Sequence, residues 1–137
     1  MSVCLDTYAL LAWVQGESAA DRVDEHLRRA AAADEADCVM SAVNLGEAFY
    51  ILARRAGSNE AELLWDRCTR GVIPVTVVEP TLARVRAAAR VKAGHRLSYA
   101  DAFAVATALE HRSPIMTGDP EILALEAVAG LEVIALR

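Results

Sequence analysis

Residues 97–120 read LSYADAFAVATALEHRSPIMTGDP, and this stretch decides the fold class. Ser98 is a predicted N-cap for the strongly apolar helix 99–111, and the apolar run 114–117 that follows is typical of a buried strand. An Asp-Pro pair then begins another helix, because proline is favoured in the first helical turn. A buried strand between two helices is typical of α/β proteins, whose parallel strands are joined by crossover helices.

The rest of the chain repeats this alternation. Apolar or β-branched runs predict strands, and helical patterns predict the segments between them. The other predicted strands are residues 3–5, 38–40, 72–78 and 132–136, and the other predicted helices are 8–15, 18–33, 41–57, 59–71, 80–94 and one beginning at 119. The sequence therefore predicts an α/β sandwich with a mainly parallel sheet.

Local signals set the predicted boundaries. Pro74 lies within strand 72–78 and moves that strand towards an edge of the sheet, because proline cannot donate a ladder hydrogen bond. Helix starts are predicted from capping side chains and from proline. These start signals are Ser18, Ser41, the Asn59 and Glu62 pair that resembles a capping box, and Pro80.

Composition indicates one soluble domain. The 137 residues fit a single domain, residues 1–137, and a hydrophobic fraction of 55% with 5% aromatics predicts a core of mainly Ala, Val, Leu and Ile. No apolar run reaches the ~18 residues that a membrane helix needs, and the start of the chain lacks a signal-peptide pattern. We therefore expect a cytoplasmic protein without a membrane partner.

Cysteine content and charge exclude two classes of protein. Cys4, Cys38 and Cys68 are odd in number and lack the spacing of zinc ligands, so neither a disulfide framework nor a zinc site is predicted. The net charge of −5 argues against a general nucleic-acid binder, because such binding depends on Lys and Arg. A phosphate-bearing substrate stays possible if metal neutralises acids gathered in one site.

Two aspartates directly follow predicted strands. Asp6 comes after strand 3–5. Asp119 comes after strand 114–117, and the intervening Gly118 would allow a sharp bend. Because open parallel sheets bind ligands outside the carboxyl ends of their strands, we expect both carboxylates at one edge of the sheet.

Two further acids lie in predicted helices among apolar neighbours. Apolar residues dominate the positions three and four residues away from Glu47 and from Asp101. A helix face of this kind normally lies against protein rather than solvent. Both carboxylates are therefore expected to point at a specific partner.

Four such carboxylates together would favour a cation. Neighbouring buried carboxylates raise one another's pKa unless a cation lies among them. Oxygen ligands without suitably spaced His or Cys favour Mg²⁺ or Mn²⁺, which can bind a phosphodiester and lower the pKa of an attacking water. The acids that predict this hydrolytic phosphate chemistry are Asp6, Glu47, Asp101 and Asp119.

A resemblance to a known family rests on four segments. These are CLDTYALL (4–11), SAVNLGEAFYIL (41–52), LSYADAFAVATA (97–108) and IMTGDPEI (115–122). Together they resemble PIN domains, specifically the VapC-like toxin nucleases of type II toxin–antitoxin systems, over nearly the whole chain. The resemblance implies a three-layer α/β/α sandwich around a mainly parallel sheet, and Mg²⁺- or Mn²⁺-dependent endoribonuclease activity, often on tRNA or rRNA.

The resemblance also implies residue roles and partners. By motif, the catalytic metal-binding acids would be Asp6, Glu47, Asp101 and Asp119. The polar neighbours that orient ligands or water would be Thr7, Asn44 and Thr117. The implied partners are an RNA substrate, a VapB-like antitoxin and a second copy of the chain. The apolar excess, including the amphipathic first two helices, suggests surfaces for both protein partners.

Each acid alone also has an ordinary structural explanation. Asp6 and Asp119 could be N-caps, and Glu47 could simply be exposed. Asp101 could complete a capping box with Ser98. The four acids in four matching contexts favour the functional interpretation.

Two other functions stay open. A metal-dependent phosphatase or phosphate-receiving signalling domain also places an Asp after its first strand. However, Asp6-Thr7-Tyr8 lacks the second acid of the common aspartyl-phosphatase motif, and no acidic pair or matching strand-end lysine marks a receiver domain. The second alternative is a catalytically weak interaction module with the PIN fold, which the complete set of acids disfavours.

Overall fold

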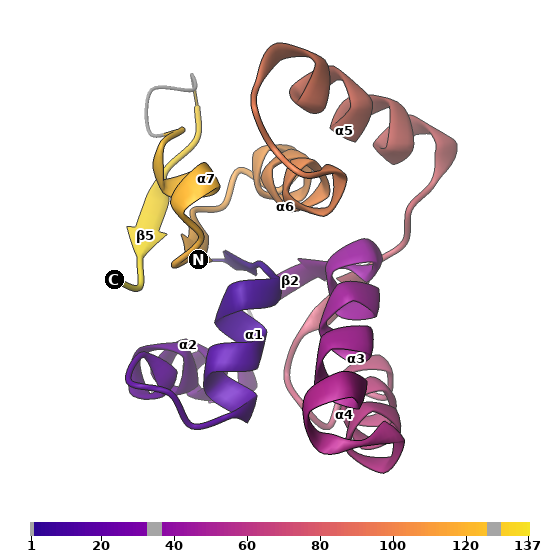
Figure 1. Cartoon of the computed structure of the whole chain (residues 1–137). Coiled ribbons are helices and arrows are strands. Elements are labelled where there is room, and N and C mark those ends of the chain that lie inside the picture. The colour runs from indigo at the N-terminus through magenta and orange to yellow at the C-terminus, as the bar shows by residue number, and fades with distance from the viewer. Residues whose placement is uncertain (1, 33–36, 126–129) are drawn as a thin grey trace.

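The computed structural model describes residues 2–32, 37–125 and 130–137, and within these ranges five strands form one parallel sheet (Figure 1). The strand order is β3 (Thr76–Val78), β2 (Cys38–Ser41), β1 (Val3–Leu5), β4 (Ile115–Thr117) and β5 (Val133–Ala135). The direction of strand succession reverses between β1 and β4. Sheets of this type bind ligands at such a switch point, outside the carboxyl ends of the strands.

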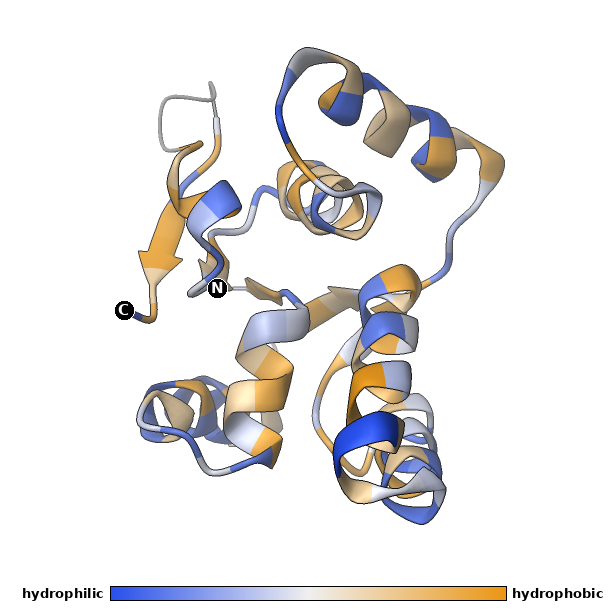
Figure 2. Ribbon diagram, viewed as in Figure 1, coloured by the Kyte–Doolittle hydropathy of each residue, from blue (hydrophilic) through white to orange (hydrophobic). Residues whose placement is uncertain are grey.

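Helices cover both faces of the sheet and give three layers (Figure 1). One face carries α1 (Thr7–Val14), α2 (Ala20–Ala32), α3 (Ala42–Ala56) and α4 (Ser58–Thr69), and the other carries α5 (Leu82–Gly94), α6 (Tyr99–Glu110) and α7 (Pro120–Leu123). Figure 2 shows mainly apolar residues on α6, between α5 and the sheet, and many hydrophilic residues on the outer helices α2 and α5. The predicted three-layer α/β/α fold with a mainly parallel sheet is confirmed.

Alternate residues of each strand pack against opposite layers. Val3 and Leu5 belong to the core beneath α1 to α4, whereas Cys4 belongs to the core beneath α6. Because both faces are covered, the central strands β2, β1 and β4 are buried along their whole length. All three cysteines are buried and free.

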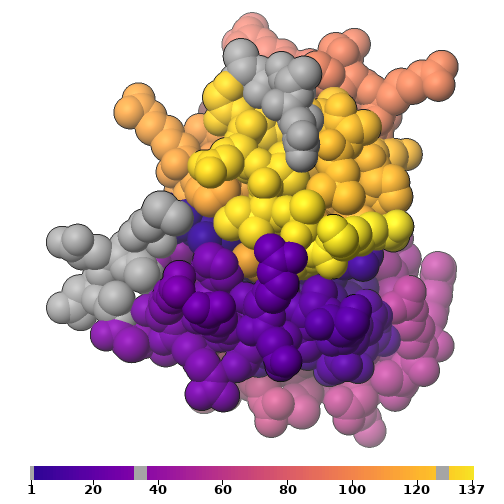
Figure 3. Space-filling view, turned by 90° about the vertical axis from the view of Figure 1, so that its left-hand side faces the viewer, coloured from indigo at the N-terminus to yellow at the C-terminus, as the bar shows by residue number. Residues whose placement is uncertain are grey.

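Segments from the two ends of the chain lie side by side (Figure 3). Arg22 on α2 donates from Nη1 to the backbone oxygen of Ala135 in β5, at 2.6 Å. The Arg137 guanidinium lies 5.7 Å from the centre of the Tyr8 ring on α1. These contacts attach the last strand to the first two helices.

The starts of β3 and α4 differ from the predicted ones. The strand predicted over residues 72–78 is shorter in the structure, where β3 begins only at Thr76. It lies at the sheet edge, as Pro74 indicated. Gly57 adopts a φ of 100° and turns the chain directly from α3 into α4. Asn59 therefore lies within α4, and no described side chain caps that helix.

Two more helix starts are shifted by one or two residues. The hydroxyl of Thr81 accepts a hydrogen bond from the Arg84 backbone N–H, so Thr81 rather than Pro80 begins α5. α2 begins at Ala20 rather than at Ser18, and the predicted end of that helix at residue 33 lies outside the described residues. Ser41 is the N-cap of α3 as predicted.

The apolar sides of the first two helices, which the sequence suggested as partner surfaces, lie largely in the core. Leu10 on α1 and Val23 and Leu27 on α2 are buried. The large exposed apolar side chains of the described residues lie elsewhere, at Tyr50, Leu63, Trp65, Val72, Leu82 and Tyr99. In the ranges described, no helix has both the length and the apolar character that a membrane crossing requires.

Candidate active site

Asp6 is both a helix cap and a cleft residue. It follows β1 at the carboxyl edge of the sheet, and its Oδ1 accepts a hydrogen bond from the backbone N–H of Ala9 at 2.8 Å, as an N-cap of α1 does. Its Oδ2 accepts a hydrogen bond from the hydroxyl of Thr117. Asp6 is only 1% exposed, so the carboxylate is nearly removed from solvent.

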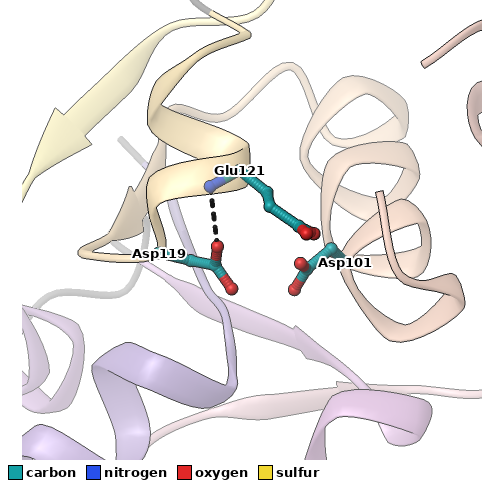
Figure 4. A group of neighbouring side chains, drawn as sticks. All are labelled: Asp101, Asp119 and Glu121. Carbon is teal, nitrogen blue, oxygen red and sulfur yellow. Dashed lines mark hydrogen bonds between the residues drawn. The ribbon is translucent and has the colours of Figure 1, made fainter. Parts of the chain in front are cut away.

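Thr117 connects Asp6 to Asp119. Its Oγ1 donates to Asp6 and accepts a hydrogen bond from the backbone N–H of Asp119 at 2.9 Å. Asp119 in turn caps α7, with its Oδ1 accepting a hydrogen bond from the Glu121 backbone N–H at 2.8 Å (Figure 4). The structure therefore places Thr117 where the sequence predicted a polar neighbour of the acids.

Gly118 lies between these residues for a reason that the sequence did not reveal. The sequence predicted that glycine would allow a sharp bend there, and Gly118 is not among the described glycines with positive φ, which are Gly16, Gly57, Gly71 and Gly130. A Cβ atom at Gly118 would instead lie 2.3 Å from Cε1 of Tyr8. Gly118 thus makes room for the Tyr8 ring beside the cleft.

Asp101 lies in the first turn of α6 and faces Asp119 and Glu121 (Figure 4). Carboxylate oxygens of these three residues all lie within 4.8 Å of one another, and they form the group of acids in the described residues that is close enough to share one ion. Glu121 was absent from the predicted site. Its position two residues after Asp119, in the first turn of the same helix, is the signal that could have suggested it.

Asp101 completes only half of the capping box considered from the sequence. Ser98 Oγ accepts a hydrogen bond from the Asp101 backbone N–H at 3.1 Å. The Ser98 backbone N–H, however, donates to Oε2 of Glu121 at 3.3 Å. A carboxylate from α7 therefore takes the place that the fourth capping-box residue normally fills.

Glu47 lies on α3 and lines the same cleft, which has a volume of about 660 Å³. It is half-buried and outside the group formed by Asp101, Asp119 and Glu121. The structure thus brings all four predicted acids to one cleft, and three of them, Asp6, Asp101 and Asp119, follow or begin elements at the switch point. The acids that line the cleft are Asp6, Glu17, Glu47, Asp101, Asp119 and Glu121.

Thr7 and Asn44 join helices beneath the cleft. The Thr7 hydroxyl donates to the Asn44 backbone oxygen at 3.2 Å and accepts a hydrogen bond from Asn44 Nδ2 at 3.3 Å. Asn44 Nδ2 also donates to the backbone oxygen of Ala100 on α6, at 3.0 Å. Asn44 is completely buried, so it fixes α3 relative to α1 and α6. Neither side chain has a hydrogen bond to one of the four acids.

Burial and neighbouring acids raise the pKa of two carboxyl groups in the cleft, Asp6 and Asp101. Burial raises the pKa of Asp6 to about 7, and the charges of Asp119 and Glu47 add to this increase, while the hydrogen bonds from Thr117 and Ala9 oppose it. Burial also raises the pKa of Asp101, followed by the charge of Asp119. The ion pairs among the described residues involve none of these acids.

This donor set fits a hard divalent cation. Several carboxylate oxygens face one another, and no Lys or Arg of the described residues forms an ion pair with them. A cation would remove the cost of ionising them together. Carboxylate ligands suit Mg²⁺ or Mn²⁺.

Arg55 is the basic residue that lines the cleft. It lies in the last turn of α3, where a basic side chain also suits the helix dipole. Its Nη1 donates to Oε1 of Gln15 at 2.8 Å, which attaches the end of α3 to the end of α1. The neighbouring Arg54 instead stacks over the Tyr50 ring, 5.1 Å from its centre.

Comparisons with known proteins agree with this fold. The family model described as PIN domain matches residues 3–129, and no curated protein matches the chain. Similar solved structures include VapBC2 from Rickettsia felis bound to a promoter DNA fragment, with TM-score 0.70, 12% identity and 98% of each chain covered. VapC20 from Mycobacterium tuberculosis, a sarcin–ricin loop cleaving toxin, has TM-score 0.70, 21% identity and coverage of 90% of this chain and 94% of that chain.

A toxin–antitoxin complex from Klebsiella pneumoniae is also similar, with TM-score 0.69, 16% identity and 98% of each chain covered. At these identities the likeness concerns the fold alone. The family match, in contrast, spans nearly the whole sequence, from β1 to beyond α7. This chain therefore belongs to the PIN domain family.

Proposed function

We propose that this chain is the toxin of a toxin–antitoxin pair and acts as an endoribonuclease that depends on Mg²⁺ or Mn²⁺. The observation that carries the proposal is the cleft at the carboxyl edge of the sheet, where Asp6, Asp101 and Asp119 converge. Membership of the PIN family and the likeness to structures that are themselves called toxins support it. The chain would act as one domain in the cytoplasm.

In this proposal the position of each acid decides its role. Asp101 and Asp119 would hold the cation, because their carboxylate oxygens lie within 4.8 Å of one another. Asp6 and Glu47 line the same cleft and complete the negative site. When bound, the divalent ion would supply charge neutralisation at the phosphodiester and a lowered pKa for an attacking water.

The net reaction is a hydrolysis. Water adds to phosphorus, the bond from phosphorus to one ester oxygen breaks, and the leaving oxygen takes up a proton. The chain's own residues orient the RNA for this step. Arg55 is well placed to hold a phosphate beside the one that reacts, since a guanidinium binds phosphate through paired N–H groups.

The direct test is cleavage of total cellular RNA by the purified protein, which includes the tRNA and rRNA substrates that we expect. Wild type should produce discrete fragments with Mg²⁺ or Mn²⁺ and none with chelator. Asp6→Ala should abolish cleavage while the protein stays folded by circular dichroism. Equal cleavage by Asp6→Ala, or by wild type in chelator, would overturn the proposal.

We further propose a homodimer and an antitoxin of the VapB type as protein partners. The large exposed apolar side chains on α3 and α4, among them Tyr50, Leu63 and Trp65, support a protein-binding surface. Light scattering after size-exclusion chromatography should give twice the mass of one chain. A monomer that is active and binds no antitoxin would contradict this part of the proposal.

A further inference from the structure

We propose that Glu121 is a positioning residue that holds Asp101 and Asp119 in the arrangement that binds metal. This inference rests on the proposed function, because it concerns the same cation site. Glu121 would act through hydrogen bonds that join the starts of α6 and α7, rather than as a required metal ligand.

Glu121 is attached to both helices that carry the candidate ligands. Its backbone N–H donates to Oδ1 of Asp119 at 2.8 Å, which fixes one oxygen of that carboxylate (Figure 4). Its side-chain Oε2 accepts a hydrogen bond from the backbone N–H of Ser98 at 3.3 Å, at the N-cap of α6. One residue thus connects the start of α7 to the start of α6.

This attachment releases the Asp101 carboxylate from a capping role. Asp101 is three residues after the N-cap Ser98, where an acidic side chain ordinarily turns back to bind the N-cap N–H. Because Glu121 already binds that N–H, Asp101 can direct its carboxylate towards Asp119 and the cleft. The sequence gives Asp101 two competing roles, and the contact between α6 and α7 settles which one it takes.

The substitutions Glu121→Gln and Glu121→Ala distinguish a positioning role from a role as a metal ligand. The amide oxygen of Gln can still accept the Ser98 N–H but is a weaker ligand without charge, whereas Ala can do neither. Residues that orient metal ligands contribute about 10- to 100-fold to metal affinity. Glu121→Ala should therefore weaken Mn²⁺ binding at least about tenfold, and Glu121→Gln only about threefold or less.

The experiment measures the Mn²⁺ dissociation constant by calorimetry for the full chain and its variants. Glu132→Ala is the matched control, because this exposed acid precedes β5 and so lies at the amino ends of the strands, away from the cleft. The Glu132→Ala variant should bind Mn²⁺ as wild type does. Hydrogen exchange of the Ser98 amide in metal-free protein is the second measurement. Exchange should be about tenfold faster in Glu121→Ala and unchanged in Glu121→Gln, since an opened hydrogen bond exposes the amide.

The outcomes separate this inference from the proposed function. Equal losses of affinity in Glu121→Gln and Glu121→Ala, with an unchanged Ser98 amide, would make Glu121 a ligand and overturn the positioning role. Wild-type affinity in both variants would also overturn it, while the proposed site would stand if Asp101→Asn loses Mn²⁺. Failure of wild type itself to bind Mn²⁺ would overturn the proposed function and this inference together.

Discussion

Thr117 shows how much of the cleft depends on one hydroxyl group. It donates to Asp6 and accepts from the Asp119 backbone, so it fixes two candidate ligands that are far apart in the sequence. The sequence placed Thr117 at a strand end among acids but could not show which groups it bonds. That information arises only when β1 and β4 pair.

Replacing Thr117 by Val keeps the side-chain shape and removes both hydrogen bonds. The buried Asp6 oxygen then lacks a donor, and we expect the free energy of unfolding to fall by about 1–3 kcal/mol. Urea denaturation in chelator at pH 8 measures this change. Thr76→Val is the matched control, because the Thr76 hydroxyl bonds an exposed Asp37 and its loss should change stability by about 0.5 kcal/mol or less. Equal effects of the two substitutions would contradict the role of Thr117.

Asp6 predicts an unusual dependence of stability on pH. Its pKa is raised to about 7 in the folded protein, chiefly by burial, against a value near 3.9 when unfolded. Between these values the folded chain keeps a proton that the unfolded chain has lost, so the free energy of unfolding falls as pH rises through this window. The fall amounts to about 4 kcal/mol at most for this group, from about 1.4 kcal/mol per pKa unit.

Urea denaturation of metal-free protein at pH 5 and pH 8 tests this dependence. Asp6→Asn keeps the N-cap of α1, since Asn also accepts the Ala9 N–H, but it carries no charge. This variant should lose less stability between the two pH values than wild type does, and the fall that remains is due to Asp101, whose pKa is also raised. Equal free energies of unfolding of wild type at pH 5 and pH 8 would show that ionisation of Asp6 does not destabilise the fold.

At the scale of elements, one face of helix α3 contributes three residues to the cleft. Glu47, Ile51 and Arg55 recur every four residues and all line the cleft. The periodicity of α3 and its N-cap Ser41 could be predicted from the sequence. The role of Arg55 could not, because Arg54 beside it has the same charge and only the helix phase in the fold separates them.

The two arginines therefore form a matched pair. Arg55→Ala should raise the KM for RNA about tenfold, the equivalent of one lost charge-assisted hydrogen bond of about 1.4 kcal/mol. Arg54→Ala should leave KM within about twofold, because Arg54 stacks on Tyr50 rather than lining the cleft. Steady-state cleavage of an RNA fragment checks both values. A larger effect for Arg54 would place the RNA path elsewhere.

Helix starts were the weakest predictions at this scale. Single side chains such as Asn59 and Pro80 gave plausible caps, but Gly57 and the hydroxyl of Thr81 begin these helices. A cap is selected by the path of the neighbouring backbone as well as by residue type. In contrast, Asp6 and Asp119 follow strands, and the strand order brings them to one edge whatever the exact helix starts.

At the scale of the whole molecule, the order of strands and helices followed from the alternating pattern of the sequence. Glu121 was missed because its hydrogen bond to Ser98 depends on the packing of α6 against α7, and its place two residues after Asp119 is the local signal for it. The same reason applies to Gly118, which makes room for the ring of Tyr8 on α1.

The whole fold should respond to metal in a way that depends on pH. Mn²⁺ should raise the melting temperature clearly at pH 8, because it binds the ionised carboxylates of Asp6 and Asp101 and stabilises the folded state by mass action. At pH 5 the raised pKa values keep these groups protonated, so Mn²⁺ should have little effect. Thermal denaturation with Mn²⁺ or chelator at both pH values measures this. Equal stabilisation at pH 5 and pH 8 would point to a cation site elsewhere.

The most direct measurement is a crystal structure of this protein grown with Mn²⁺, with the ion located by its anomalous scattering. We expect a peak in the cleft between α6 and α7, bound by carboxylate oxygens of Asp101 and Asp119 at about 2.2 Å, with Asp6 in or next to the coordination sphere. An occupied site away from these residues, or a cleft without Mn²⁺ at millimolar concentration and pH 8, would contradict the metal-dependent site.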